Sequence, residues 1–209
     1  KIIIALDGMD RNSVFNLLEK IPDAIWVKVG LELFISEGPE ILSILRNKGK
    51  KIFLDLKFHD IPTTVSKACF VASKTGVEFI SLHTCAGKKA LKMAKDSVNE
   101  GAAKVNLTPP KLLGITVLTS WTQESFLDDL LINQSINQRV KHLAEIAWDS
   151  GLAGCVCSPR EVKFLRGIYP EEFELVTPGI RPLGANLNDQ SRVSDVSDAL
   201  KMGASKLVV

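Results

Sequence analysis

The sequence predicts a single (β/α)8 barrel, because short apolar runs of β type alternate with longer amphipathic segments of helical period along all 209 residues. The predicted strands are Ile2–Leu6, Ile25–Val29, Ile52–Leu56, Phe79–Leu82, Gly114–Leu118, Gly154–Cys157, Glu174–Val176 and Lys206–Val209. The predicted helices are Val14–Lys20, Glu37–Asn47, Thr64–Thr75, Lys88–Asn99, Asn137–Ser150, Pro159–Leu165 and Val193–Met202. Because the composition does not change along the chain, residues 1–209 are expected to form one parallel α/β domain, at the short end of the size range of this fold.

Two features of the chain bear on which parallel fold it forms. A doubly wound open sheet, the competing architecture, is expected to carry a G-x-G-x-x-G phosphate turn after its first strand, and Asp7-Gly8-Met9-Asp10 does not supply one. The barrel is therefore favoured. The chain also stops at Val209, inside the eighth predicted strand. Since a closed barrel continues into a loop and a helix after that strand, we expect these C-terminal residues to be missing from this sequence.

Composition and charge narrow the classes of function. The chain is 45% hydrophobic and 24% charged with a formal net charge of +2, which is typical of a globular protein and predicts neither a nucleic-acid nor a membrane partner. The apolar runs are far shorter than a bilayer span, and no signal-peptide pattern opens the chain. The cysteines at positions 69, 85, 155 and 157 follow no disulfide or zinc spacing, so we expect buried reduced thiols in a cytoplasmic protein.

Charged residues at the ends of the predicted strands are the strongest candidates for a site. Asp7 ends the first strand, Lys28 lies in the second, and Asp55 and Lys57 end the third. Active sites of (β/α)8 barrels lie at the C-terminal ends of the strands, and the connecting loops complete them. These four residues therefore predict the position of an active site.

Strand periodicity indicates which of these side chains meet. Side chains alternate along a strand, so Asp55 and Lys57 share the face that points into the barrel mouth, about 6.6 Å apart along the backbone. Leu54 and Leu56 share the opposite face, which suits contact with helices. Lys28 points inward by the same argument, from the neighbouring strand. The sequence therefore predicts a cluster of two lysines and a carboxylate in the mouth.

An ordinary ion pair at the barrel rim is the plain alternative for this cluster. Charges held among apolar strands are costly unless they are paired, and such arrangements often mark functional sites. Mutual attraction would hold each of Lys28, Asp55 and Lys57 in its charged form. A cationic acid beside an anion suits a reaction that creates a carbanion and then protonates it, and we favour this functional interpretation.

The histidines are weaker candidates. His59 has the parity of Asp55 and Lys57, but strand periodicity is expected to fail where the loop begins, so a structural hydrogen bond is favoured over a general base. His83, at the end of the fourth strand, is treated with the same caution. His142 lies in the middle of a predicted helix and is interpreted as a surface or packing residue.

The later loops contain candidates for binding a phosphate and a polar ring. Gly179 and Arg181 follow the seventh strand, where barrels frequently bind phosphate through backbone N–H groups and a cationic fork. A plain Gly-Pro turn with a surface arginine is the alternative for this segment. The polar stretch 183–191 has the composition of a lid, and Thr119 and Ser120 offer hydroxyl groups after the fifth strand.

These motifs together closely resemble the orotidine 5′-monophosphate decarboxylases, especially their bacterial branch, over essentially the whole chain and in order. The matching segments are Ala5-Leu6-Asp7, Lys28-Val29-Gly30, Phe53-Leu54-Asp55-Leu56-Lys57-Phe58-His59-Asp60-Ile61-Pro62, Val117-Leu118-Thr119-Ser120, Val156-Cys157-Ser158, Leu175-Val176-Thr177-Pro178-Gly179-Ile180-Arg181-Pro182 and Asp189-Gln190. The segment 53–62 is long and specific. The resemblance implies decarboxylation of orotidine 5′-monophosphate to uridine 5′-monophosphate in de novo pyrimidine biosynthesis, without a metal or other cofactor.

The resemblance also implies a role for each residue of the cluster. Lys28, Asp55 and Lys57, with Asp60 from a second subunit, would form the alternating charged tetrad of the family. Lys57 would deliver a proton to C6 of the pyrimidine, and Asp55 would lie against the departing carboxylate. The implied substrate-binding residues are Asp7, Lys28, Asp60, Ile61, Thr64, Thr119, Ser120, Gly179, Arg181 and Gln190. A homodimer with shared active sites follows from this assignment.

Within the implied set, Asp7 and Lys28 would hold the ribose hydroxyls, and Asp60 and Thr64 would reach the nucleotide of the neighbouring subunit. Thr119 and Ser120 would contact the pyrimidine. Arg181 and Gln190 would belong to the phosphate-binding region and its lid.

The sequence departs from the family pattern in two places. The Gly-Arg pair that the family carries after the eighth strand would begin where the chain ends at Val209, so a principal phosphate ligand is not seen. Thr63 stands where asparagine is frequent, a change that we expect to be tolerated. Two rival functions stay open: a metal-dependent sugar-phosphate decarboxylase or aldolase that shares Asp-x-Lys-x-x-Asp, and a catalytically silent protein that binds a nucleotide phosphate.

Overall fold

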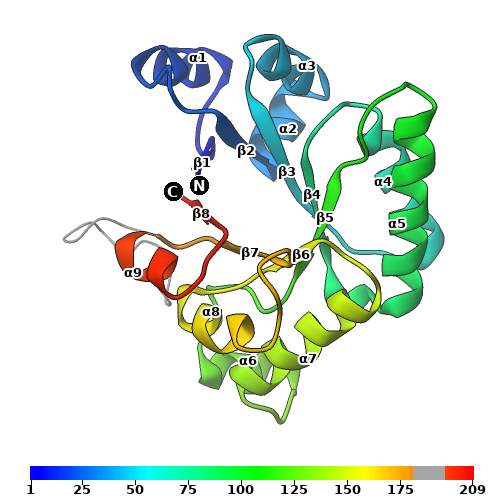
Figure 1. The fold of residues 1–209 in the computed structure, drawn as a ribbon, viewed down its shortest axis with the longest axis vertical. Coiled ribbons are helices and arrows are strands. Elements are labelled where there is room, and N and C mark those ends of the chain that lie inside the picture. The colour runs from blue at the N-terminus through cyan, green and yellow to red at the C-terminus, as the bar shows by residue number, and fades with distance from the viewer. Residues whose placement is uncertain (181–195) are drawn as a thin grey trace.

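The computed structural model, described here for residues 1–180 and 196–209, is a closed parallel barrel of eight strands in the order β1 to β8, surrounded by helices (Figure 1). The strands are β1 Ile2–Ala5, β2 Trp26–Gly30, β3 Lys51–Phe58, β4 Phe79–His83, β5 Lys111–Ile115, β6 Gly154–Val156, β7 Glu174–Thr177 and β8 Lys206–Val208. The helices of the described residues are α1 Arg11–Lys20, α2 Leu31–Glu37, α3 Glu40–Asn47, α4 Pro62–Ser73, η1 Thr84–Ala86 (a 3₁₀ helix), α5 Lys88–Ala103, α6 Gln123–Leu130, α7 Ile136–Asp149, α8 Pro159–Arg166 and α9 Val196–Lys201. The predicted (β/α)8 barrel is confirmed.

The two ends of the chain lie side by side in the barrel wall (Figure 1). Strand β1 pairs in parallel with both β2 and β8. The Val209 N–H donates to the Ile3 carbonyl at 3.0 Å, and the Ala5 N–H donates to the Val209 carbonyl at 2.7 Å. The last strand therefore closes the barrel against the first.

Apolar side chains fill the inside of the barrel and the layer between strands and helices. The inner group consists of Ile3, Phe53, Phe79, Leu113, Val176 and Val208. On β3 the neighbouring residues Ile52 and Leu54 point the other way, into the larger core shared with the helices. Burying one such side chain contributes roughly 1.5–3 kcal/mol. The alternation predicted for β3 is thus confirmed from Ile52 to Asp55, and it directs polar inward-facing residues to the barrel ends.

Strand β5 lies three residues earlier than predicted, at Lys111–Ile115 instead of Gly114–Leu118. The Lys111 N–H donates to the Glu78 carbonyl at 2.8 Å, which sets the register with β4. Gly114 faces the helices, where a Cβ atom would lie 2.6 Å from the Thr84 hydroxyl oxygen. The prediction was wrong because the apolar run continues past the strand into a loop. As a result, Thr119 lies in a loop at the barrel mouth and not directly at a strand end.

The helices differ from the prediction at two places. The predicted helix Glu37–Asn47 corresponds to α3, which begins at Glu40 because Gly38 adopts a φ of 65° and Pro39 follows it, and the preceding helix α2 was not predicted. Helix α6 was not predicted. Its N-cap, Thr122, forms a reciprocal capping box with Ser125, whereas the usual sequence signal has Glu or Gln at that position. Of the predicted helix Val193–Met202, the described part is α9.

None of the helices in the described ranges combines the length and the apolar character that a membrane span requires. The four cysteines are free thiols. Cys69, Cys155 and Cys157 are buried as predicted, but Cys85 is exposed. The prediction was wrong for Cys85 because that residue lies in η1, at the C-terminal end of β4, where the barrel opens to solvent.

Candidate active site

The C-terminal end of β3 departs from regular strand geometry at the residues predicted to be catalytic. Leu54 pairs with Ile80 and Phe58 pairs with Leu82, so β3 has two more residues than β4 between these pairs. Lys57 lies in this irregular stretch with a φ of 50°, in the left-handed region. For a residue other than glycine, such a conformation costs on the order of 1–3 kcal/mol and is found preferentially at functional sites. The irregular backbone therefore sets the direction of the Lys57 side chain.

Asp55 is the centre of the charged cluster, and its side chain is only 9% exposed. Its Oδ2 accepts a hydrogen bond from Lys57 Nζ at 2.8 Å and lies 3.7 Å from Lys28 Nζ. Lys28 Nζ also donates to both carboxylate oxygens of Asp7, at 2.8 and 2.9 Å. The structure thus joins Asp7, Lys28, Asp55 and Lys57, which we call the mouth cluster. The predicted convergence is confirmed, and Asp7 is part of the same network.

Exposure differs strongly within the mouth cluster. The side chain of Lys28 is 10% exposed, that of Lys57 is 32% exposed and that of Asp7 is 58% exposed. The two innermost groups, Lys28 and Asp55, are therefore the best shielded from water, where the attraction between charges is strongest. Lys57 and Asp7 lie at the edge that a ligand can reach.

Ser81 was missed by the sequence analysis although it is central to the site. Its hydroxyl, fully buried, donates to Asp55 Oδ1 at 2.7 Å and accepts the Lys57 backbone N–H at 2.9 Å. One side chain thereby fixes the second carboxylate oxygen of Asp55 and the left-handed backbone of Lys57. One feature of the sequence could have revealed Ser81: it is a serine at an inward position of β4, two residues after the inward Phe79.

Gly30 belongs to a segment that resembles the family, but the sequence did not predict it as part of the site. A Cβ atom at Gly30 would lie 2.7 Å from Asp7 Oδ1 and 3.2 Å from Lys28 Nζ. The absence of a side chain at the end of β2 therefore leaves the space in which Asp7 and Lys28 meet. This requirement depends on the neighbouring strand β1 and could not be derived from local sequence.

The mouth cluster lines one wall of a cavity at the C-terminal ends of the strands. Its remaining lining residues are Phe53, Ile115, Val117, Leu118, Thr119, Ser120, Val156, Cys157, Pro178 and Val208. The predicted Thr119 and Ser120 thus lie at the same cavity as Lys57. A mostly apolar cavity with a few convergent polar groups is the usual form of a small-molecule site.

Other predicted residues lie apart from this cavity or cannot be placed. Asp60, Ile61 and Thr64 are exposed at the start of α4 and are not among the residues that line it. Gly179 follows the cavity residue Pro178 with a φ of 73°, a conformation that favours glycine. Arg181 and Gln190 lie outside the described residues.

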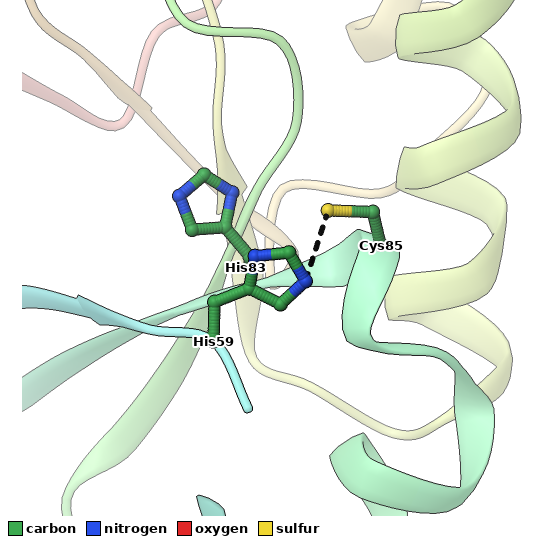
Figure 2. A group of neighbouring side chains, drawn as sticks. All are labelled: His59, His83 and Cys85. Atoms are coloured by element: carbon green, nitrogen blue, oxygen red, sulfur yellow. Dashed lines mark hydrogen bonds between the residues drawn. The ribbon is translucent and has the colours of Figure 1, made fainter. Parts of the chain in front are cut away.

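The rings of His59 and His83 lie next to each other (Figure 2), with their centroids 5.1 Å apart. His59 Nε2 lies 3.7 Å from the Cys85 sulfur, within hydrogen-bond distance. Burial, followed by the charges of His59 and Lys57, lowers the pKa of His83 to about 4. His83 is therefore neutral at pH 7. Because neither ring lines the cavity of the mouth cluster, the geometry agrees with a supporting role for both.

The arrangement suits chemistry that forms negative charge on a bound molecule. Two ammonium groups and two carboxylates alternate along the wall as Asp7, Lys28, Asp55 and Lys57. A preorganised ammonium group stabilises a developing anion without reorganisation at the moment of reaction. Lys57, which can reach the cavity, can also supply a proton.

Comparison with known proteins agrees with this geometry. Residues 1–209 match the family described as "Orotidine 5'-phosphate decarboxylase / HUMPS family". A curated relative from Prochlorococcus marinus (strain NATL2A), named orotidine 5′-phosphate decarboxylase, is 78% identical over the whole chain, which covers 87% of that relative. A relative of the same name from Prochlorococcus marinus (strain MIT 9211) is 56% identical over the same length, again covering 87% of the relative. The crystal structure of orotidine 5′-phosphate decarboxylase from Lactobacillus acidophilus superposes with a TM-score of 0.87 at 36% identity, covering all of this chain and 88% of the other. The chain belongs to the orotidine 5′-phosphate decarboxylase / HUMPS family.

Proposed function

We propose that this protein decarboxylates orotidine 5′-monophosphate to uridine 5′-monophosphate, a step of pyrimidine biosynthesis. The observation that carries the proposal is the mouth cluster, in which Lys57 Nζ lies 2.8 Å from Asp55 Oδ2 at a cavity lined by apolar residues and a few polar groups. The names of relatives up to 78% identical support the same substrate. The enzyme is accordingly a carboxy-lyase.

The proposed chemistry follows from the charges around the cavity. The substrate carboxylate would lie towards Asp55, whose negative charge disfavours the bound ground state. The bond from C6 to the carboxylate carbon breaks, the electron pair stays on C6, and carbon dioxide leaves. Lys57 stabilises the carbanion through its positive charge and then transfers a proton from Nζ to C6. Ser81 keeps Asp55 and the backbone of Lys57 in place during these steps.

The rest of the cavity can hold the remaining parts of a nucleotide. Asp7 and Lys28, hydrogen-bonded to each other, offer an acceptor and a donor for the ribose hydroxyls. Thr119 and Ser120 lie at the cavity and can hydrogen-bond the polar edge of the pyrimidine. The positive φ of Gly179 suits close approach of an anion to the backbone after β7, and we assign Arg181 and Gln190 to the phosphate.

We further propose a homodimer in which Asp60, Ile61 and Thr64 complete the site of the second subunit. All three side chains are exposed at the start of α4, and Ile61 is 67% exposed. Their exposure leaves these side chains accessible to a second subunit, which is where the resemblance to the family places their role. Mixing Asp60→Asn with Lys57→Ala subunits should restore activity through hybrid dimers, each with one intact site. Hybrid dimers without any recovered turnover would contradict the shared site.

The direct test is to follow the fall in absorbance of orotidine 5′-monophosphate with purified protein and no added cofactor. We expect turnover that persists in the presence of EDTA. The rival metal-dependent sugar-phosphate enzyme predicts the opposite, because chelation would abolish its reaction. A protein that binds the nucleotide without turnover would support the silent binding alternative. We also assign the enzyme to the cytoplasm, which agrees with its four free thiols.

A further inference from the structure

His59, His83 and Cys85 lie close together and come from three segments of the chain (Figure 2). His59 follows β3, His83 ends β4 and Cys85 lies in η1. One ligand atom from each residue can be chosen so that all three lie within 4.8 Å of one another. We propose that these three residues form a binding site for Zn²⁺ or a similar thiophilic divalent ion, separate from the mouth cluster and independent of the proposed decarboxylation.

The distances support a metal site that needs only small side-chain movements. The closest pair, His59 Nε2 and Cys85 Sγ, is 3.7 Å apart. Zinc binds imidazole nitrogen at about 2.0–2.1 Å and thiolate sulfur at about 2.3 Å, so two tetrahedral ligands lie a little under 4 Å apart. That pair already has this spacing. Rotation of the His83 ring, which lies tilted at 37° to the His59 ring, can bring the third ligand to the same distance.

The chemistry of the ligands favours a soft ion over magnesium or calcium. Imidazole and thiolate select zinc and copper, whereas magnesium and calcium prefer oxygen ligands. The site has three protein ligands, which leaves a fourth tetrahedral position for water. His59 and Cys85 are exposed, so an ion can enter from solvent. These features describe an exchangeable site and not a closed structural one.

Coordination requires the thiolate form of Cys85 and neutral imidazole rings. Metal binding would therefore release the thiol proton, and the sulfur would become the anionic ligand.

The site also lies close to the mouth cluster along the chain. His59 lies two residues after Lys57 and directly before Asp60. An ion held by His59 and by η1 would restrain the segment that connects the mouth cluster with α4. The binding itself can be measured without any substrate, so failure of this proposal and failure of the proposed function are distinguishable.

Titration of the metal-free, full-length chain with Co²⁺ tests the proposal. We expect a saturable thiolate-to-cobalt charge-transfer band that disappears when Zn²⁺ displaces the cobalt. Cys85→Ser should abolish the band, and His83→Gln should weaken cobalt binding at least about tenfold. His142→Gln, which changes a histidine of α7 outside the cluster, should leave the titration unchanged. No band, or a band that survives in Cys85→Ser, would overturn the proposal and leave only a thiol–imidazole hydrogen bond.

Thiol labelling gives a second measurement that does not require Cys85 to be replaced. Cys85 is exposed and the three other cysteines are buried, so a disulfide reagent should modify Cys85 first in the folded protein. Zn²⁺ should slow this labelling in the unmodified protein and have at least tenfold less effect in His83→Gln. Labelling that Zn²⁺ does not slow would also overturn the proposal.

Discussion

Lysines lie against carboxylates at both ends of the barrel, but the two groups of charges differ in backbone geometry and in what they face. At the N-terminal end, Glu174 bridges Lys111 at 2.9 Å and Lys206 at 3.2 Å, which we call the basal cluster. Lys206 also lies over the rings of Trp26 and Phe79, 5.2 and 5.1 Å from their centroids. Each charge of the basal cluster thus has a partner on regular strands.

The basal cluster has the properties of a stabilising ion network. Burial alone would raise the pKa of Glu174, but the hydrogen bonds and charges of Lys111 and Lys206 outweigh burial, and the pKa is lowered. The carboxylate is therefore more favourable in the folded protein than in the unfolded chain. The stability that the Glu174 carboxylate contributes is present above its ordinary pKa of 4.5. It is lost as the pH falls through the lower pKa that Glu174 has in the folded state.

The mouth cluster is built differently, because it includes a strained residue and faces a cavity. Lys57 has a φ of 50°, and its side chain remains 32% exposed. Residues at the C-terminal end of barrel strands serve chemistry, whereas those at the N-terminal end serve stability. The comparison shows that similar ion pairs differ in backbone strain and in access to a cavity, and this difference is why we propose a catalytic role for the mouth cluster alone.

Replacing Lys57 should have the largest effect of the changes proposed for the two clusters. Lys57→Ala is expected to lower turnover by about 10²- to 10⁴-fold or more, because it removes the acid and the positive charge at the carbanion. Lys57→Gly should be equally inactive but more stable than Lys57→Ala, by about 1 kcal/mol, because glycine adopts a φ of 50° without strain. Turnover of orotidine 5′-monophosphate and chemical denaturation measure the two effects. Near-normal turnover of Lys57→Ala would refute its role.

Ser81→Ala should show that the mouth cluster depends on the Ser81 hydroxyl to hold Asp55 and Lys57 in position. The change removes a hydrogen bond to Asp55 and one from the Lys57 backbone, which are worth roughly 1.5–3 kcal/mol when a charged group takes part. We expect kcat to fall about tenfold or more with a smaller change in KM. Ser81→Thr, which keeps the hydroxyl, should recover part of the loss. If Ser81→Ala and Ser81→Thr lower only stability, Ser81 has no positioning role.

Gly30→Ala should affect binding more than chemistry. The new Cβ atom would displace Asp7, whose side chain is 58% exposed and can move into solvent. Loss of the Asp7 carboxylate at the proposed ribose site is expected to raise KM about tenfold, consistent with a hydrogen bond from a charged group. Steady-state kinetics provide the measurement. An unchanged KM would remove Asp7 from substrate binding.

Glu174→Gln should have the smallest effect on turnover and a clear effect on stability. At pH 7 the free energy of unfolding should fall by about 1–3 kcal/mol, because two lysines lose their charged partner. The difference from the unmodified protein should shrink as the pH falls from 4.5 through the lower pKa that Glu174 has in the folded protein. Denaturation at several pH values tests this dependence. A variant that loses turnover while keeping its stability would contradict the division between the two clusters.

Local sequence patterns were sufficient to predict the barrel and the core of the mouth cluster. Alternation along β3 directed Asp55 and Lys57 to one face, and the same rule directed Lys28 inward from β2. These predictions succeeded because the period of a strand depends on neighbouring residues. The boundaries of β5 were wrong, since only pairing with β4 distinguishes its strand from the apolar loop that follows.

Tertiary structure decided the features that make the cluster a site. The left-handed backbone of Lys57, its contact with Ser81 and the space above Gly30 all depend on residues far away in the sequence. Each arises where two strands meet at a particular register, and register is a property of the closed barrel. The sequence by itself therefore determined the residues that we propose for the chemistry. Packing between strands determined the orientation of their side chains, because contact geometry is set by the whole barrel and not by the local period.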